Sequence, residues 1–323
     1  MADQVFVYIT HKGGVVDDSA LELLTAAKAI RPAAETVALV AGNGAELEQV
    51  CAEVGKSFSQ VWKLAGEAFA YPNAEVIRKA LTAILPKGAA MVLLHDTFGM
   101  DLSPGLSIKL DSTYVADVVG IEAVEGDKLK VVRQEYGGQV SSRSLCDMNN
   151  GIVVNVRSGC FAADETQAGG NAVVDKSAEA GDLSAAREFL ELIVAEAGDV
   201  DITKEDVLVA VGRGIGDEEN LEIADDLAEA LGAAVCCSRP VVDAKWLEKS
   251  RQVGTSGQTV KPKVYLACGI SGSFQHLGGI KGNPFIVAIN KNLKAPIFQV
   301  ADVGIVADIQ DFLPQLTEAV NEG

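Results

Sequence analysis

VYLACGISGSFQHLGGIKGNPFIVAINKNLKAPIFQVADVGIVAD, residues 264–308, is the part of the chain with the clearest structural pattern. An apolar run leads into a turn with two glycines, a short segment suited to a helix, and two further apolar runs, which predicts a strand, a helix and two more strands. Polar side chains stand at the ends of these elements: Ser271, Gln275, His276, Asn290 and Asp308. In a parallel α/β unit, such places are where the chain meets a nucleotide.

The same alternation continues on both sides of this stretch. Helices are predicted at residues 217–231, 274–279 and 309–321, and strands at 207–211, 234–238, 263–267, 285–289 and 303–306. Five short strands separated by helices and loops indicate a small, doubly wound domain of the Rossmann or flavodoxin type. A charged segment, 198–205, precedes it, so we expect one domain at residues 1–198 and a second at 199–323.

Residues 1–198 show a second α/β pattern. Apolar strands are predicted at 5–9, 37–41, 60–64 and 90–95, and helices at 19–30, 45–54 and 73–85. Because strands and helices alternate, a parallel sheet is expected. Asp18 or Ser19 is expected to cap the first helix, with Glu22 as the partner in a capping box.

The pattern changes beyond residue 96. From residue 113 the side chains alternate around the turn EGDK, residues 125–128, which predicts antiparallel hairpins and then a strand at 151–156. The polar segment 157–182 predicts a loop with room for one strand, and 183–197 is predicted as a helix. The first domain is therefore expected to be α/β with an antiparallel extension.

Composition restricts the class of protein. The 323 residues are 48% hydrophobic and carry a formal net charge of -18, so a large core is expected and no disordered region. The acidic surplus argues against binding nucleic acid or anionic lipid. We find no signal peptide in MADQVFVYIT, no run of 18 apolar residues, and no metal-ligand spacing among the three histidines and six cysteines, which we expect to be reduced thiols. These features predict a cytoplasmic protein without membrane insertion.

Four loops that follow or precede strands carry residues suited to a dinucleotide. They are the turn 269–272, the glycines around Arg213, the pair Ser238–Arg239, and VGTSGQTV at 253–260. A single glycine turn is more often plain structure, and the strict G-x-G-x-x-G fingerprint is missing. Four such loops meet at one edge of a doubly wound sheet, where two arginines can balance phosphate or flavin charge, so a dinucleotide pocket is predicted.

The motifs YLACGISGSFQHLGGIKG, VAIN and APIFQVADVGIVAD resemble the signature of the electron transfer flavoprotein alpha subunit family. The resemblance covers residues 200–323 strongly and the first domain through its length and element order. It implies FAD as the cofactor. Positions that match the family's FAD contacts are Arg213, Ser238, Arg239, Gln252, Thr255, Ser256, Gly257, Gly269, Ile270, Ser271, Gly272, Gln275, His276, Asn290 and Asp308.

The resemblance also implies roles for single residues. Arg213 would lie near the phosphates or the flavin, and Arg239 near the isoalloxazine ring. Asn290 and Asp308 would contact the ribityl, phosphate or adenosine parts. The family's Q-V-G-Q-T-G loop appears here as QVGTSG, 252–257, so the hydroxyl expected at flavin N5 is that of Ser256. Serine in place of threonine keeps a hydroxyl, whereas Thr255 in place of glutamine loses an amide.

The expected chemistry needs no catalytic base or nucleophile in this chain, because the cofactor carries it. A flavin that accepts one electron gains negative charge at N1 and the C2 carbonyl. A donor such as His276 or a cation such as Arg239 would stabilise that charge, so that an anionic semiquinone forms. The Ser256 hydroxyl would tune the same equilibrium.

The resemblance implies a heterodimer with a beta subunit, which the first domain contacts, and an acyl-CoA dehydrogenase as redox partner. Two forms stay open. An ordinary carrier has AMP in the beta subunit, whereas a bifurcating form has a second FAD there, takes hydride from NADH and also reduces ferredoxin or flavodoxin. We lean towards the bifurcating form, although no residue of this chain decides. A stand-alone nicotinamide dehydrogenase and a regulatory nucleotide-binding module are the remaining alternatives.

Overall fold

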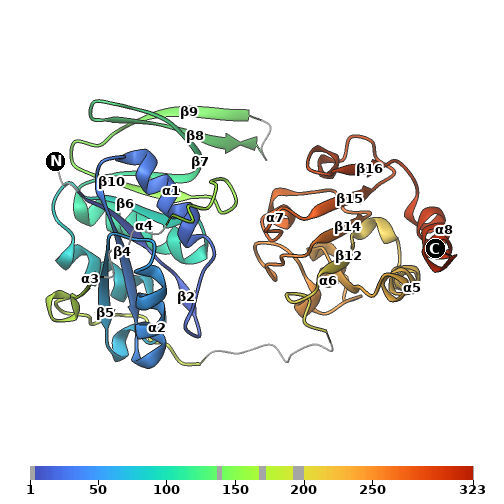
Figure 1. The fold of residues 1–323 in the computed structure, drawn as a ribbon, viewed down its shortest axis with the longest axis horizontal. Coiled ribbons are helices and arrows are strands. Elements are labelled where there is room, and N and C mark those ends of the chain that lie inside the picture. The colour runs from blue at the N-terminus through green and yellow to red at the C-terminus, as the bar shows by residue number, and fades with distance from the viewer. Residues whose placement is uncertain (1–3, 137–139, 167–171, 192–199, 323) are drawn as a thin grey trace. The chain divides into compact units, whose positions relative to one another are not determined.

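A computed structural model describes residues 4–136, 140–166, 172–191 and 200–322 (Figure 1). The chain forms two compact units, Met1–Glu191 and Leu192–Gly323, and each is described by itself. The boundary that the sequence predicts, between residues 198 and 199, lies outside the described residues. Among the described residues, no helix is both long and apolar enough to span a membrane.

The N-terminal unit is built on a mixed sheet whose described strands run in the order β11-β5-β4-β1-β6-β10-β7-β8-β9. Strands β11 to β7 are parallel, and β8 and β9 continue the sheet in antiparallel fashion. The predicted parallel sheet with an antiparallel extension is therefore confirmed. The strands are β1 Gln4–Tyr8, β4 Glu35–Gly42, β5 Gln60–Ala65, β6 Ala90–Leu94, β7 Thr113–Glu125, β8 Lys128–Glu135, β9 Val140–Asp147, β10 Ile152–Val156 and β11 Ala172–Asp175, with a small separate hairpin of β2 His11–Lys12 and β3 Val15–Val16.

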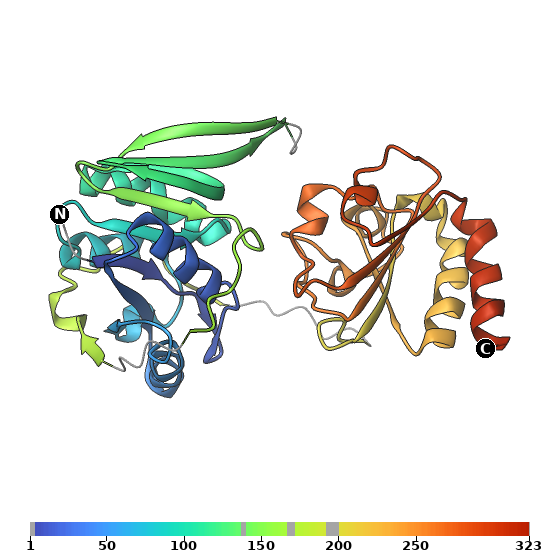
Figure 2. The ribbon, with the colours of Figure 1, turned by 45° about the horizontal axis from the view of Figure 1, so that its top comes forward.

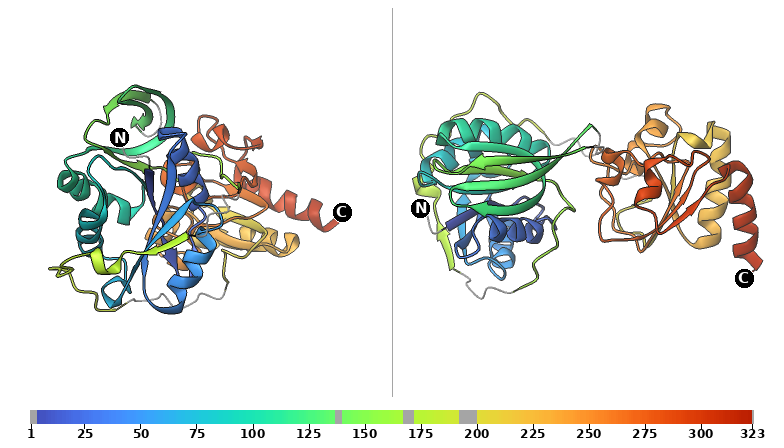
Figure 3. Two further views of the ribbon diagram at one scale, coloured as in Figure 1. Left: turned by 60° about the vertical axis from the view of Figure 1, so that its left-hand side comes forward. Right: turned by 90° about the horizontal axis from the view of Figure 1, so that it is seen from above.

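Helices cover both faces of this sheet (Figure 3). Helices α1 (Ala20–Ile30) and α2 (Gly44–Val54) bury leucine, alanine and valine side chains against one face. Helices α3 (Ala74–Ile84) and α4 (Thr97–Leu110) do the same on the other face. Because burial of apolar area drives this packing, each helix keeps its polar side outward.

One charged cluster lies where the parallel and antiparallel parts of the sheet meet. Asp117 lies in β7 with a φ of 58°, beside a register shift between β7 and β10. Its carboxylate accepts hydrogen bonds from Arg157 Nε at 2.8 Å and Nη2 at 2.5 Å, and His95 Nε2 lies 3.8 Å from it. Burial opposes the charge on Asp117, but the hydrogen bonds and charge of Arg157 outweigh it and lower the pKa of this carboxyl.

Two local predictions are wrong, the capping box of Ser19 with Glu22 and the helix over 183–191, while a cap by Asp18 stays a prediction. Ser19 precedes α1, but its hydroxyl donates to the Asp17 carboxylate, and Glu22 accepts from the backbone N–H of Gly159 instead of closing a capping box. Residues 183–191 are irregular rather than helical, and 192–197 lie outside the described residues. The Glu75 carboxylate accepts from the backbone N–H groups of Ala186 and Arg187, so this segment bonds to α3 instead of to itself.

The C-terminal unit is an all-parallel sheet whose described strands run in the order β13-β12-β14-β15-β16. This is the flavodoxin type of order, and it confirms the predicted doubly wound fold. The elements are β12 Val207–Val211, α5 Glu222–Leu231, β13 Ala234–Cys237, α6 Arg239–Asp243, β14 Val264–Cys268, α7 Phe274–Leu277, β15 Phe285–Ile289, β16 Val303–Ile305 and α8 Ile309–Glu322. Figure 2 shows α5 in yellow and α8 in red side by side.

The two faces of this second sheet are covered differently. Helices α5 and α8 pack on one face through residues such as Leu227 and Leu313. The other face is covered by loops and single turns, with Ile202, Val253 and Ile297 in its core. Strand order reverses between β12 and β14, so the crevice at their carboxyl ends is the expected ligand position in this fold.

We predict that the Asp117–Arg157 pair stabilises the N-terminal unit. Arg157→Met leaves the Asp117 carboxylate, whose side chain is only 19% exposed, without its counter-charge, so unfolding should become easier by about 3 kcal/mol. The matched control is Arg143→Met, because Arg143 is 58% exposed in its pair with Glu122 and should contribute less than about 1 kcal/mol. Urea denaturation followed by Trp62 fluorescence in a Trp246→Phe background measures both. Equal losses would contradict this role.

Candidate cofactor site

All strands of the C-terminal sheet are parallel, so their carboxyl ends lie at one edge. Gly212 follows β12, Ser238 follows β13, Gly269 follows β14 and Asn290 follows β15. Asp308 comes three residues after β16 and directly before α8. The fold thus brings the strand-end residues that the sequence singled out to the same edge of the sheet, which includes the crevice between β12 and β14.

The glycine turns after β12 and β14 touch through their backbones. The Gly212 N–H donates to the Cys268 carbonyl at 2.9 Å, and the Gly214 N–H donates to the Gly269 carbonyl at 3.1 Å. A Cβ on Gly214 would lie 2.7 Å from Gly269 Cα, and a Cβ on Gly269, where φ is 65°, would lie 2.8 Å from Gly214 Cα. These glycines are required for turn-to-turn packing whether or not a ligand is bound.

The rest of the β14 turn is held from the other side. The Ile297 N–H donates to the Ser271 carbonyl at 3.0 Å, and a Cβ on Gly272 would lie 2.4 Å from Ile297 N. Among the residues that the structure describes, no backbone acceptor pairs with the N–H groups of Ser271 and Gly272. The fixed turn therefore has two amide donors available for an anion.

The loop 252–257 lies beside the end of β13. Gln252, 4% exposed, pairs with Cys237 in an isolated bridge and donates from Nε2 to Ser256 Oγ at 3.0 Å. The Thr255 N–H donates to the Gln275 carbonyl at 2.8 Å. Ser256 itself is exposed. Because its oxygen accepts from Gln252, the hydroxyl proton can be donated outward.

The two predicted cations of the site are exposed at the starts of short helical turns. Arg213 begins the 3₁₀ turn η4 (Arg213–Ile215), and Arg239 begins α6. Arg239 Nε lies 3.4 Å from the Asp243 carboxylate, with both side chains more than half exposed. This weak surface pair leaves the guanidinium free to move to an anionic ligand.

His276 is placed differently from the other predicted residues. It is 4% exposed, with Nδ1 3.1 Å from the Val253 carbonyl and Nε2 2.8 Å from the Tyr265 hydroxyl. Burial lowers its pKa from 6.5 to about 4, only partly offset by the bond to Val253. Flavin contact by His276 stays a prediction, and it requires a ring nitrogen to exchange its present partner.

Asn290 and Asp308 follow β15 and β16 at the same edge of the sheet. The Asn290 amide donates to the Ile270 carbonyl at 2.9 Å, and its oxygen accepts from Asn292 N–H at 2.9 Å. Asp308 lies 3.6 Å from Lys291 Nζ. Asn290 is thus a support of the β14 turn in this structure, whereas Asp308 and Lys291 keep exposed charged groups beside it.

Sequence reasoning missed Tyr265 and Lys291. Tyr265 lies inside an apolar strand, where its hydroxyl gives no local signal. Lys291 follows Asn290 directly and belongs to none of the glycine or hydroxyl motifs that mark the site. The chemistry of its ammonium beside a strand end could have indicated it.

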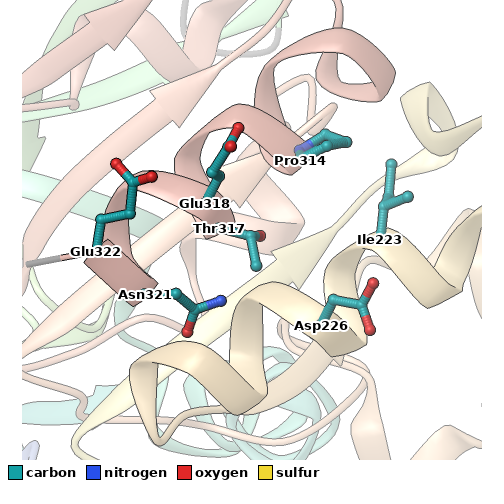
Figure 4. Close-up of a pocket in the computed structure, with 7 residues that line it drawn as sticks. All are labelled: Ile223, Asp226, Pro314, Thr317, Glu318, Asn321 and Glu322. Carbon is teal, nitrogen blue, oxygen red and sulfur yellow. The ribbon is translucent and has the colours of Figure 1, made fainter.

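A separate groove of about 380 Å³ lies between α5 and α8 (Figure 4). Its carboxylates, Asp226, Glu318 and Glu322, would repel the phosphates of a dinucleotide. The other lining residues are Ile223, Pro314, Thr317 and Asn321. No predicted cofactor residue lines it, so we do not assign the cofactor to this groove.

The contact between the glycine turns should be intolerant of a methyl group. Gly269→Ala adds left-handed backbone strain of about 1–2 kcal/mol and overpacking of about 1–3 kcal/mol against Gly214. Gly232→Ala, where φ is 60° and no atom lies within 4 Å of the added Cβ, should cost only the strain. Urea denaturation followed by Trp246 fluorescence in a Trp62→Phe background compares them. If both variants lose the same stability, the close contact has no energetic weight.

Burial of His276 predicts a pH dependence of stability. Between pH 6.5 and about 4 the unfolded chain binds a proton that the folded unit excludes, so the unfolding free energy decreases as the pH falls through this window. The limit is about 3 kcal/mol, and above pH 6.5 this contribution is constant. His276→Gln, which keeps a donor and an acceptor, should flatten this part of the profile. Parallel profiles for the two proteins would show that His276 is protonated normally.

Comparison with known proteins bears on both units. The electron transfer flavoprotein domain matches residues 5–181, and the electron transfer flavoprotein FAD-binding domain matches residues 201–281. The relatives that are similar along almost the whole chain include the following three. Electron transfer flavoprotein subunit alpha of Clostridium acetobutylicum is 31% identical, covering 98% of this chain and 96% of that protein. The mitochondrial electron transfer flavoprotein subunit alpha of Oryza sativa subsp. indica is 33% identical, covering 96% of this chain and 88% of that protein. Protein FixB of Clostridium saccharobutylicum is 32% identical, covering 98% of this chain and 96% of that protein. The chain belongs to the electron transfer flavoprotein alpha subunit family, and its C-terminal unit carries that family's FAD-binding domain.

Proposed function

We propose that this chain holds FAD at the carboxyl edge of its C-terminal sheet and passes electrons singly as one subunit of a heterodimer. The observation that supports this most is the meeting of the strand-end loops at the point where strand order reverses, within a domain of an FAD-binding family. FAD supplies a ring that accepts and releases electrons. The chain supplies binding, orientation and charge.

Each part of the edge fits a part of FAD. The free N–H groups of Ser271 and Gly272, with the cation of Arg213, suit the pyrophosphate. Arg239 and the hydroxyl of Ser256 are assigned to the ring. The remaining predicted contacts lie in these loops, in α7, or after β15 and β16: Ser238, Gln252, Thr255, Gly257, Gly269, Ile270, Gln275, His276, Asn290 and Asp308.

The two residues assigned to the ring, Arg239 and Ser256, differ in what they can do to it. Arg239 is a permanent cation, so it stabilises negative charge on the ring more strongly the closer the guanidinium lies to the ring. Ser256 is neutral, and because its oxygen already accepts from Gln252, its hydroxyl proton can be donated to the ring. Arg239 should therefore affect redox potential most, and Ser256 the orientation of the ring.

The proposed partners are an electron transfer flavoprotein beta subunit and a flavin-dependent acyl-CoA dehydrogenase. In the bifurcating form, which we favour, the beta subunit binds a second FAD that takes hydride from NADH. One of the two electrons then passes to the FAD of this chain, and the other passes to ferredoxin or flavodoxin. In the ordinary form, the beta subunit holds AMP. The neutral pair Thr255 and Ser256 is compatible with either form.

Cofactor analysis of the purified heterodimer separates these forms. Two FAD per heterodimer and bleaching by NADH support bifurcation, whereas one FAD with one AMP and no reaction with NADH support the ordinary carrier. A colourless heterodimer that takes up no added FAD would contradict the proposed function itself.

The role of Arg239 predicts a shift in redox potential. Arg239→Met should lower the midpoint potential of the bound FAD by roughly 40 mV or more, because a cation near the reduced ring is worth about 1 kcal/mol or more at an effective dielectric constant of 20. The matched control is Lys263→Met, which removes an exposed cation paired with Asp206 at the opposite edge of the same sheet. Spectroelectrochemical titration measures both. If the two variants shift the midpoint potential equally, the potential depends only on the net charge of the protein, and the proposed role of Arg239 is wrong.

A further inference from the structure

A chain of hydrogen bonds runs through the core of the C-terminal unit beneath the loop 252–257. The Cys236 thiol lies 4.0 Å from the Tyr265 hydroxyl, which lies 2.8 Å from His276 Nε2, and His276 Nδ1 lies 3.1 Å from the Val253 carbonyl. Cys236 and Tyr265 are fully buried, and His276 is 4% exposed. The chain of hydrogen bonds joins β13, β14, α7 and the loop, of which β14 and α7 are labelled in Figure 1.

The direction of every bond in this chain follows from its last member. A backbone carbonyl can only accept, so the proton on the His276 ring must be on Nδ1. Burial keeps the ring neutral, and Nε2 therefore carries a lone pair that accepts from Tyr265. The Tyr265 oxygen in turn accepts from the thiol, whose pKa is raised by burial so that it stays protonated. All donors point the same way, which lets the bonds strengthen one another.

The direction of these hydrogen bonds determines how the loop that presents Ser256 is held. The imidazole holds Val253, and the residue next to the imidazole, Gln275, accepts from the Thr255 N–H. Gly254 lies against the same turn, since a Cβ on it would lie 2.8 Å from the Gln275 carbonyl oxygen. An imidazole that rotates, or that carries its proton on Nε2 instead of Nδ1, would lose its bond to Val253 and so one of the bonds that hold the loop.

We propose that Tyr265 is a positioning residue of the FAD edge. The Val253 carbonyl fixes the Nδ1–H tautomer of His276, the Tyr265 hydroxyl holds the ring by donating to Nε2, and the imidazole so held positions the loop that presents Ser256 to the cofactor. The inference rests on the proposed function only for the identity of the ligand. The tautomer and the position of the loop are properties of this chain alone.

The tautomer is measured directly by ¹⁵N NMR of the histidine side chains in the full-length chain, with and without FAD. The three histidines are distinguished by the loss of one signal set in His276→Gln. We expect wild-type His276 to show a neutral ring protonated at Nδ1. A proton on Nε2 in the FAD-free chain overturns the inference, even if no variant is made.

Tyr265→Phe removes only the hydroxyl. The Nε2 signal of His276 should move, and the dissociation constant of FAD should rise roughly tenfold, the effect of one lost buried hydrogen bond. Tyr8→Phe is the matched control, because Tyr8 is also buried but lies in the N-terminal unit, and it should change neither quantity. Unchanged His276 signals and FAD affinity in a folded Tyr265→Phe protein overturn the inference.

The outcomes separate the two proposals. A wild-type chain that binds no FAD, alone or with the beta subunit, contradicts the proposed function, while the NMR result still decides the tautomer. A wild-type chain that binds FAD with an Nε2–H imidazole before FAD is added contradicts only the role of Tyr265. If circular dichroism shows that Tyr265→Phe does not fold, the tautomer of His276 in the wild-type chain decides whether the inference stands.

Discussion

The reversal of strand order between β12 and β14 is the constraint on which the cofactor edge depends. Chains that leave these neighbouring strands turn to opposite faces of the sheet and leave a crevice at its edge, at whose base their first residues meet. Here the meeting is made by backbone alone, through the bonds of Gly212 and Gly214 to the turn after β14. The loops carrying Ser256 and Asn290 then attach to that turn, directly or through His276 and Ile270.

The fold of both units was largely predictable because buried parallel strands leave a strong mark in sequence. The apolar run predicted at 263–267 became β14 at Val264–Cys268, and the turn 125–128 became the β7–β8 turn with Gly126 at φ 62°. The segment 183–191 was not predictable in this way. Its alanine, glutamate and leucine residues favour a helix, but Glu75 and the stacking of Tyr71 on Phe189 hold it in an irregular path.

The sequence predicted which loops meet at the sheet edge, but not the hydrogen-bond partners of the side chains within them. Motif residues identify the loops, and parallel topology then brings the loops together. The environment of His276 could not be read in advance, because its two partners, Val253 and Tyr265, are fixed only by tertiary packing. Gln252 and Ser256 are an intermediate case: they are four residues apart, yet their bond needs the loop to turn back on itself.

The reciprocal contact of Gly214 and Gly269 also limits how the sequence can drift. When two large side chains meet, a gain of volume at one can be compensated by a loss at the other. Here both partners already lack a side chain, and an added Cβ on either meets the backbone of the other. No compensating substitution exists at this pair, so a viable change would need a new path for one of the two turns. Both positions must therefore stay glycine, whereas the less constrained hydroxyl and amide positions of the same sheet edge can still vary.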